Sequence, residues 1–286
     1  VKYVLSPYKI NGLELIEDFP IFNNKKLYIN NNSLPFALVY TDNAIELKEN
    51  FNNFEYQEYL YSVLLGKQCH FYHKLDYKRN ISDNKSTYMV DIPKNKNLSL
   101  YGRFVTDNPP SMLNVNNQYK SIYSQWLSPS VFYIPTEKLN EKNQVFVDLE
   151  RDNEKDFFYD AFFYALDLDE FSTVVSSLKK NAPSKIIIKN GYAYFECNSE
   201  FNQRLFVSIP FNKGWKVTVN GKVLNSYDFV QFGNFLFSIP LEEGKNVVEM
   251  KFYLPGFKTG ILIFVIGLLI LIAVTIYEFR FKKIIK

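Results

Sequence analysis

An uncharged apolar segment near the C-terminus limits what this chain can fold into. Gly260 to Tyr277 reads GILIFVIGLLILIAVTIY, eighteen residues without a charged side chain. As an α-helix this segment would be about 27 Å long at 1.5 Å per residue, which nearly matches the hydrocarbon core of a bilayer. Buried helices of water-soluble proteins seldom run so far without a charge. The segment therefore predicts a transmembrane helix, over residues 257–279 when its flanks are included.

Aromatic and basic residues border this segment. Aromatic side chains are typical of the membrane–water interface, and those at the two ends are Phe252, Tyr253, Phe257, Tyr277, Phe279 and Phe281. The chain has a net charge of +3, and all of it comes from the last nine residues, where four basic side chains outnumber Glu278. Lys and Arg are retained on the cytoplasmic side. We therefore expect a cell-membrane protein with a cytoplasmic basic tail, residues 280–286, and an extracytoplasmic body.

Charge alone does not decide this topology. Lys245, Lys251 and Lys258 lie shortly before the span, so a tail-anchored protein with a cytosolic body stays open. An external body needs an export signal, but the chain opens VKYVLSPYKI, without an initiator Met, a basic n-region or an apolar h-region. We expect the chain to be the C-terminal part of a longer protein, whose upstream transmembrane domain carries the body across the bilayer.

The composition of the body excludes several classes of protein. The first 277 residues carry no net charge, which argues against a nucleic-acid partner, because such partners require a concentrated basic face. Apolar residues make up 47% of the chain and aromatic residues 17%, so it can bury a core and is not disordered. With only two cysteines a disulfide scaffold is excluded, while a single Cys69–Cys197 bridge stays open.

Patterning predicts a fold that is mainly β with a few helices, namely β-sandwich-like extracytoplasmic domains followed by one C-terminal transmembrane helix. Capping boxes predict two helices in the body, one starting near Asn52 with Glu55 and one starting at Asp167 with Glu170. The expected segments are 1–85, a mixed α/β entry segment; 86–182, a β-rich domain ending in a helix; 183–256, a β-sandwich domain; 257–279, the transmembrane helix; and 280–286, the tail.

The last part of the body contains a recurring corner and a hairpin. Ser208-Ile209-Pro210-x-x-x-Gly214 recurs as Ser238-Ile239-Pro240-x-x-x-Gly244. In each copy Pro ends a strand and Gly permits the turn back, which predicts two equivalent corners of one sandwich. Asn220-Gly221 predicts a type I′ turn, since both residues accept positive φ. Trp215 alternates with polar residues beside it and is expected in the core.

These residues carry a resemblance to a known family. IPFNKGWKVTVNGK, at residues 209–222, followed by EEGKNVVEMKFYLPGFKTG and an apolar helix, resembles the end of the bacterial YfhO family of multi-spanning membrane proteins. The opening VKYVLS, the SLPFALV segment and the ALDLDEFSTVVSSLKK helix also fit, so the resemblance covers nearly the whole chain. Phe36 departs from the basic residue expected there. The residues that match the family motif, with structural roles, are Pro210, Gly214, Trp215, Gly221 and Gly244.

The resemblance implies a large N-terminal membrane part related to type-C glycosyltransferases, which use a lipid-linked sugar to decorate cell-surface polymers such as lipoteichoic acid. The catalytic carboxylate of such an enzyme is expected on an early extracytoplasmic loop, so no catalytic residue is assigned in this chain, and no cofactor is expected. The body would be a non-catalytic part with a cell-wall polymer or lipid-linked sugar as partner. The alternative is a membrane-anchored carbohydrate-binding or interaction module without transferase activity.

Two short motifs could bind metal, and in both the structural interpretation is favoured. Cys69-His70-Phe71-Tyr72-His73 contains three potential metal ligands, but a structural zinc site needs about four, and the chain has no second such cluster. Asp167-Leu168-Asp169 is similar to the metal-binding D-x-D of nucleotide-sugar transferases. A carboxylate at the start of a helix is better explained as its cap. No metal site is assigned.

Other enzyme chemistry has little support in the sequence. A Ser–His–Asp triad would have only two histidines to draw on, and no G-x-S-x-G motif is present. Exposed aromatic rings can stack on sugars, although most aromatic residues of this chain alternate as sandwich core. Tyr119 and Tyr123 are the speculative sugar contacts, because they were expected in loops.

Overall fold

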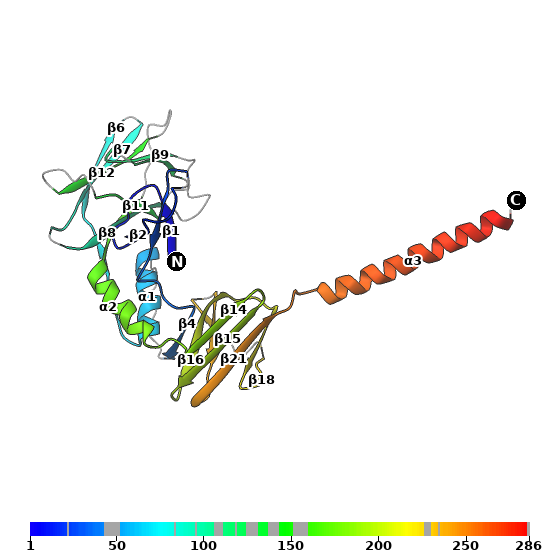
Figure 1. Ribbon diagram of the computed structural model, residues 1–286. Coiled ribbons are helices and arrows are strands. Elements are labelled where there is room, and N and C mark those ends of the chain that lie inside the picture. The colour runs from blue at the N-terminus through cyan, green and yellow to red at the C-terminus, as the bar shows by residue number, and fades with distance from the viewer. Residues whose placement is uncertain are drawn as a thin grey trace. The chain divides into compact units, whose positions relative to one another are not determined.

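The computed structural model divides the chain into two compact units. The first unit contains Val1–Pro35 and Asp42–Asn181, and the second contains Phe36–Thr41 and Ala182–Lys286. Antiparallel strands dominate both units, and the described residues also form the helices α1, α2 and α3 (Figure 1). The predicted fold class is confirmed. The described residues are 1–21, 23–42, 52–82, 84–94, 96–105, 111–117, 119–123, 131–136, 143–150, 160–225, 230–233 and 235–284.

Three sheets form the first unit. A small sheet has the order β1-β3-β2, a five-stranded sheet has the order β10-β9-β12-β7-β6, and a four-stranded sheet has the order β11-β8-β13-β5. Their strands are β1 (Tyr3–Ser6), β2 (Glu14–Leu15), β3 (Lys26–Ile29), β5 (Tyr72–Lys74), β6 (Tyr77–Ser82), β7 (Lys85–Asp91), β8 (Leu98–Val105), β9 (Ser111–Val115), β10 (Tyr119–Tyr123), β11 (Phe132–Ile134), β12 (Gln144–Glu150) and β13 (Asp160–Asp167).

The two larger sheets of this unit pack face to face. Alternate residues of β7, β8, β12 and β13 point inward and belong to one buried cluster. Tyr88 on β7 and Phe104 on β8 meet with ring centroids 5.1 Å apart. Phe163 on β13 contacts both rings. Tilted ring contacts from Tyr88 to Phe104 and Phe163 thus join the two sheets.

Both predicted helices of the body form with the predicted N-cap residues, but only α1 has the complete capping box, because the Glu170 side chain in α2 contacts His73. α1 (Asn53–Leu65) has Asn52 as its N-cap and a complete capping box with Glu55, and it ends at Gly66 in the left-handed conformation. α2 (Leu168–Lys179) has Asp167 as its N-cap. Its apolar residues repeat every three to four positions, so Val174, Val175 and Leu178 are buried.

The second unit is a two-sheet sandwich. One sheet has the order β14-β15-β21-β17-β18 and the other the order β19-β20-β16-β4, and a single buried cluster contains residues of both. The strands are β4 (Ala37–Thr41), β14 (Lys185–Lys189), β15 (Tyr192–Ser199), β16 (Gln203–Pro210), β17 (Trp215–Val219), β18 (Lys222–Val223), β19 (Val230–Phe232), β20 (Leu236–Pro240) and β21 (Gly244–Phe252).

The units do not follow the order of the sequence. β4 comes from the entry segment but pairs with β16, with Val39 opposite Leu205. In the first unit β6 and β7 form a hairpin across residues 82 to 85, next to the predicted boundary between 85 and 86. The predicted domain ranges stay predictions.

The helix α3 (Phe257–Ile284) follows β21 after four residues. The candidate span Phe257–Glu278 contains an 18-residue window with a mean hydropathy of 2.9, and none of that window is buried within the protein. The helix is apolar on all sides and has no protein packed around it. It is also long enough to cross a bilayer. The predicted span thus has the length and composition of a membrane helix.

The turn at Asn220-Gly221 provides the first test. Its φ angles are 51° and 80°, as a type I′ turn requires, and a Cβ at Gly221 would meet no atom within 4 Å. Gly221→Ala should therefore destabilise the second unit by about 1–2 kcal/mol through backbone conformation alone.

Thermal unfolding of the detergent-solubilised chain measures this change. Gly267→Ala is the matched control, because Gly267 lies in α3 without a positive φ and its Cβ would also meet nothing. Equal unfolding temperatures for the two variants would contradict the turn type.

Candidate functional site

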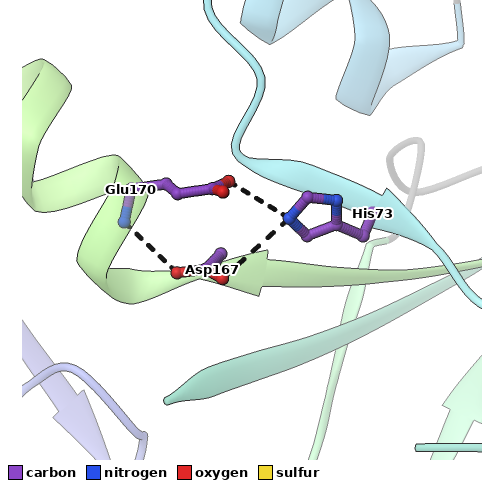
Figure 2. Close-up of side chains that lie close together, drawn as sticks. All are labelled: His73, Asp167 and Glu170. Carbon is purple, nitrogen blue, oxygen red and sulfur yellow. Dashed lines mark hydrogen bonds and ion pairs between the residues drawn. The ribbon is translucent and has the colours of Figure 1, made fainter. Parts of the chain in front are cut away.

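Three titratable side chains gather where α2 begins. His73 lies on β5, Asp167 ends β13, and Glu170 lies in the first turn of α2 (Figure 2). His73 Nε2 is 3.1 Å from Glu170 Oε2 and 4.0 Å from Asp167 Oδ2. Antiparallel pairing places β5 beside β13, with Ala165 opposite His73, and this brings residues 97 positions apart in sequence into contact.

Asp167 has several partners at once. Its Oδ1 accepts hydrogen bonds from the backbone N–H groups of Asp169 and Glu170, each at 3.2 Å. Its Oδ2 accepts one from Lys96 Nζ, also at 3.2 Å. Burial would raise the pKa of Asp167, but the Glu170 N–H and the Lys96 ammonium outweigh it, so the pKa lies below its usual value. Asp167 is therefore held as a carboxylate by its partners.

This cluster has the ligand types that divalent metals use. One atom of each side chain lies within 4.8 Å of the other two, and imidazole nitrogen with two carboxylates can coordinate such ions. However, the ammonium group of Lys96 already neutralises Asp167. Within the described residues the cluster is thus satisfied by its own ion pairs and by the helix that it caps.

The two aspartates of the D-x-D motif have different partners. Asp167 caps α2 as expected, which confirms the capping prediction. Asp169 Oδ1 accepts a hydrogen bond from Asn97 Nδ2 at 3.1 Å, away from the partners of Asp167. The two carboxylates therefore do not act as a pair, and both hold the start of α2 against the loop before β8.

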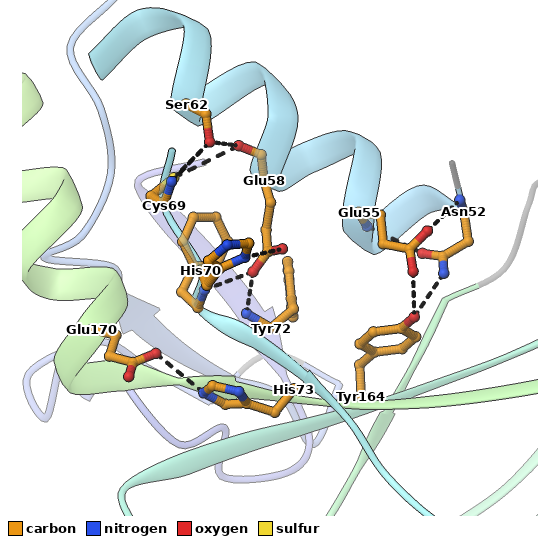
Figure 3. A network of polar contacts seen from close by, with 11 residues as sticks. Asn52, Glu55, Glu58, Ser62, Cys69, His70, Tyr72, His73, Tyr164 and Glu170 are labelled. Atoms are coloured by element: carbon orange, nitrogen blue, oxygen red, sulfur yellow. Dashed lines mark hydrogen bonds and ion pairs between the residues drawn. The ribbon is translucent and has the colours of Figure 1, made fainter. Parts of the chain in front are cut away.

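The Cys69–His73 segment is similarly divided, as Figure 3 shows. Cys69 faces α1, where its N–H donates to Ser62 Oγ at 3.0 Å. His70 is mostly exposed, with Nδ1 3.7 Å from Glu58 Oε2, and His73 faces α2. The three potential ligands, which lie within five residues of sequence, thus have three different surroundings. His73 instead contacts Glu170. No local sequence pattern predicted this contact.

Glu58 fastens this segment to α1. Its Oε1 accepts hydrogen bonds from the N–H groups of Phe71 and Tyr72, both at 2.6 Å. Charge-assisted bonds of this kind are about twice as strong as neutral ones. Burial raises the pKa of the Cys69 thiol above its usual value, so this cysteine is not an activated nucleophile.

A second polar group lies at the start of α1 (Figure 3). Asn52 Nδ2 donates to Tyr164 Oη at 2.7 Å, and Tyr164 Oη donates to Glu55 Oε1 at 3.1 Å. Burial is the main cause and the nearby Glu55 carboxylate a smaller one, and the pKa of Tyr164 is raised to about 12. This tyrosine therefore stays protonated and ties the helix cap to β13.

The family-motif residues lie at turns of the second unit. Pro210 ends β16, and Gly221 and Gly244 have positive φ. Gly214 is required for space, because a Cβ there would lie 2.5 Å from the carbonyl oxygen of Tyr253. The same two residues are hydrogen-bonded, with Tyr253 N donating to Gly214 O at 2.8 Å. The motif thus joins β17 to the end of β21.

Trp215 lies half-buried at the edge of the second unit's core. Its ring meets Phe252 edge-on, with centroids 5.2 Å apart. A shallow pocket opens beside it, lined by Phe211, Asn212, Lys213, Trp215, Lys216, Leu224 and Phe237. The pocket combines aromatic walls with two lysines.

The two speculative sugar contacts have different positions. Tyr123 is only 3% exposed, and its hydroxyl donates to the backbone oxygen of Phe104, so it offers no face to a sugar. Tyr119 is half-buried and packs edge-on against Tyr8. Both lie on strand β10 rather than in a loop. A sugar contact stays a prediction, and it rests on Tyr119.

Cys69 and Cys197 are both buried free thiols.

Comparisons with known proteins gave one match. The family model described as "Bacterial membrane protein YfhO" matches residues 1–264. No curated protein and no solved structure matches the chain.

The Asp167 cap should show a distinctive pH dependence. The folded-state pKa of Asp167 lies below 3.8. Its carboxylate therefore stabilises the fold above that pH, and this contribution is lost as the pH falls through the folded-state pKa. At pH 7 Asp167→Ala should cost about 1 kcal/mol for the lost cap. The difference in unfolding free energy between wild type and variant should shrink at pH 3.

Asp167→Asn separates the cap from the charge. Asn caps helices as well as Asp does, so this variant should lose less stability than Asp167→Ala at pH 7. A cost for Asp167→Ala that is the same at pH 7 and pH 3 would contradict the ionic role of Asp167.

Proposed function

The chain belongs to the YfhO family of bacterial membrane proteins, and from this premise we propose that its body is the extracytoplasmic, non-catalytic part of a YfhO-like glycosyltransferase. The match covers the body and the first turns of α3, and this is the observation that carries the proposal. Such an enzyme would transfer sugar from a lipid-linked donor to a cell-surface polymer such as lipoteichoic acid. The body would position the acceptor near a membrane-embedded active site.

The non-catalytic role is supported by how the body uses its reactive groups. Asp167 is engaged by Lys96 and by the start of α2. Glu58 is engaged by backbone N–H groups, and burial raises the thiol pKa of Cys69 and that of Cys197, the latter to about 11. Each of these groups is engaged in holding elements together or is held in its unreactive form. The reacting groups are therefore expected in the membrane part of the protein.

The proposed sidedness follows from charge. The basic residues after Tyr277 favour a cytoplasmic C-terminus, which would leave both units outside the cell. The polymers that such an enzyme would decorate are on that side.

Cysteine labelling in intact cells tests the sidedness. Phe201 is 85% exposed in the turn between β15 and β16, and Phe281→Cys adds a thiol to the tail without removing a charge. A membrane-impermeant maleimide should label Phe201→Cys in intact cells and Phe281→Cys only after permeabilisation. The parent chain, whose two cysteines are buried, is the control. The reverse pattern would indicate a cytosolic body.

Polymer analysis tests the enzymatic role. Cells that lack the gene should have less sugar on their surface polymer, and the whole protein should restore it. Purified residues 1–254 should transfer no sugar from a labelled lipid carrier. Transfer by this fragment would make the non-catalytic assignment wrong. An unchanged sugar content in cells that lack the gene would favour the alternative, a membrane-anchored carbohydrate-binding or interaction module.

A further inference from the structure

The strand pairing of the second unit places several turns at the end from which α3 leaves. Lys251, near the end of β21, lies opposite Tyr192, which follows the β14–β15 turn. Phe252 lies opposite Trp215, at the start of β17. Pro210, just before that strand, lies opposite Leu236, which follows the β19–β20 turn. We call residues 189–192, 210–216 and 252–256, with Gly233 and Phe235, the helix-proximal end.

The helix-proximal end is tied closely to the membrane helix. Only Tyr253, Leu254, Pro255 and Gly256 separate β21 from α3. Five steps between Cα atoms extend at most about 18 Å. Trp215 packs on Phe252, so the pocket beside it is held within this short reach of the bilayer.

Exposed apolar side chains surround the same end. They are at least two-fifths exposed, and they include aromatic rings of the kind that prefer the interface: Ile188, Phe235, Tyr253, Leu254 and Phe257. Within a water-soluble surface such a group would be a liability. Next to a membrane span these side chains can enter the headgroup region.

Charge distinguishes the two ends of the sandwich. The helix-proximal segments contain Lys189, Lys213 and Lys216 but no Asp or Glu. At the opposite end Glu200, Glu242 and Glu243 in the turns before β16 and β21 outnumber Lys222 and Lys245. The end that α3 tethers to the bilayer is thus the basic one.

The lysines of the pocket are also available to a ligand. Elsewhere in this unit Lys185, Lys222 and Lys251 each pair with a glutamate at 2.9–3.2 Å. Among the residues that the structure describes, Lys213 and Lys216 form no ion pair, and both are exposed. They flank the pocket whose walls include Phe211 and Trp215. Two unpaired ammonium groups beside aromatic rings can bind a phosphate group that carries an apolar substituent.

We propose that the helix-proximal end binds the headgroups of anionic phospholipids, with Lys213 and Lys216 meeting the phosphate and the Trp215 pocket receiving the glycerol region. The sandwich then rests on the bilayer at a second place besides α3. This inference needs the membrane span but not the transferase activity, so it can fail or hold independently of the proposed function.

Fluorescence of Trp215 in the reconstituted full chain tests the proposal. The chain has two tryptophans, so Trp126→Phe leaves Trp215 as the reporter. The chain is placed in vesicles of phosphatidylcholine alone, or with about one third phosphatidylglycerol, and each contains a lipid with a nitroxide on its headgroup. We expect at least about twofold stronger quenching with phosphatidylglycerol. The excess should disappear in about 1 M NaCl, where the Debye length is about 3 Å.

Paired variants localise the effect. Lys213→Gln with Lys216→Gln should abolish the excess quenching, while Lys222→Gln with Lys245→Gln, which removes the same charge elsewhere, should preserve it. Circular dichroism checks that each variant is folded. Equal quenching in the two lipids, or loss of the excess in both pairs, would overturn the proposal. So would competition by soluble glycerol phosphate, because the site would then bind free phosphate rather than the membrane.

Discussion

The membrane helix continues the central strand of the second unit, and the rest of that unit is built around this connection. β21 is the middle strand of its sheet, paired with β15 on one side and β17 on the other. Only four residues then lead to α3. Gly214 lets the start of β17 approach the end of β21 closely enough for a hydrogen bond to Tyr253. The connection to the anchor is therefore hydrogen-bonded to the sheet at Tyr253, directly after β21.

In the first unit the conspicuous polar motifs hold secondary structure in place. Glu58 fixes the chain after α1 to the helix itself, and Asp167 caps α2 while it binds Lys96. Buried or half-buried carboxylates are costly unless they are paired and hydrogen-bonded, and here both conditions are met. Residue types that suggest catalysis in a sequence can thus serve to fasten helices to a sheet.

Local features were predictable from the sequence, and contacts across long stretches of sequence were not. The caps at Asn52 and Asp167, the turn at Asn220-Gly221 and the apolar span each depend on a few neighbouring residues. The contact of His73 with Glu170 depends on strand pairing across 97 positions. Tyr123 was expected in a loop, but it lies on β10 and its ring packs against Phe104 and Phe132 from other strands.

The pairing of β4 with β16 has a consequence for how the chain reaches its native state. Most of the first unit, Asp42–Asn181, is inserted in sequence between β4 and the remainder of the second unit, while Val1–Pro35 precedes β4. The insert can fold as soon as it is complete, but β4 must wait for β16, and the sheet opposite needs β21, which emerges last before the anchor. Contacts between such distant segments form slowly. The second unit can therefore complete its fold only after β21 has been made, directly before α3.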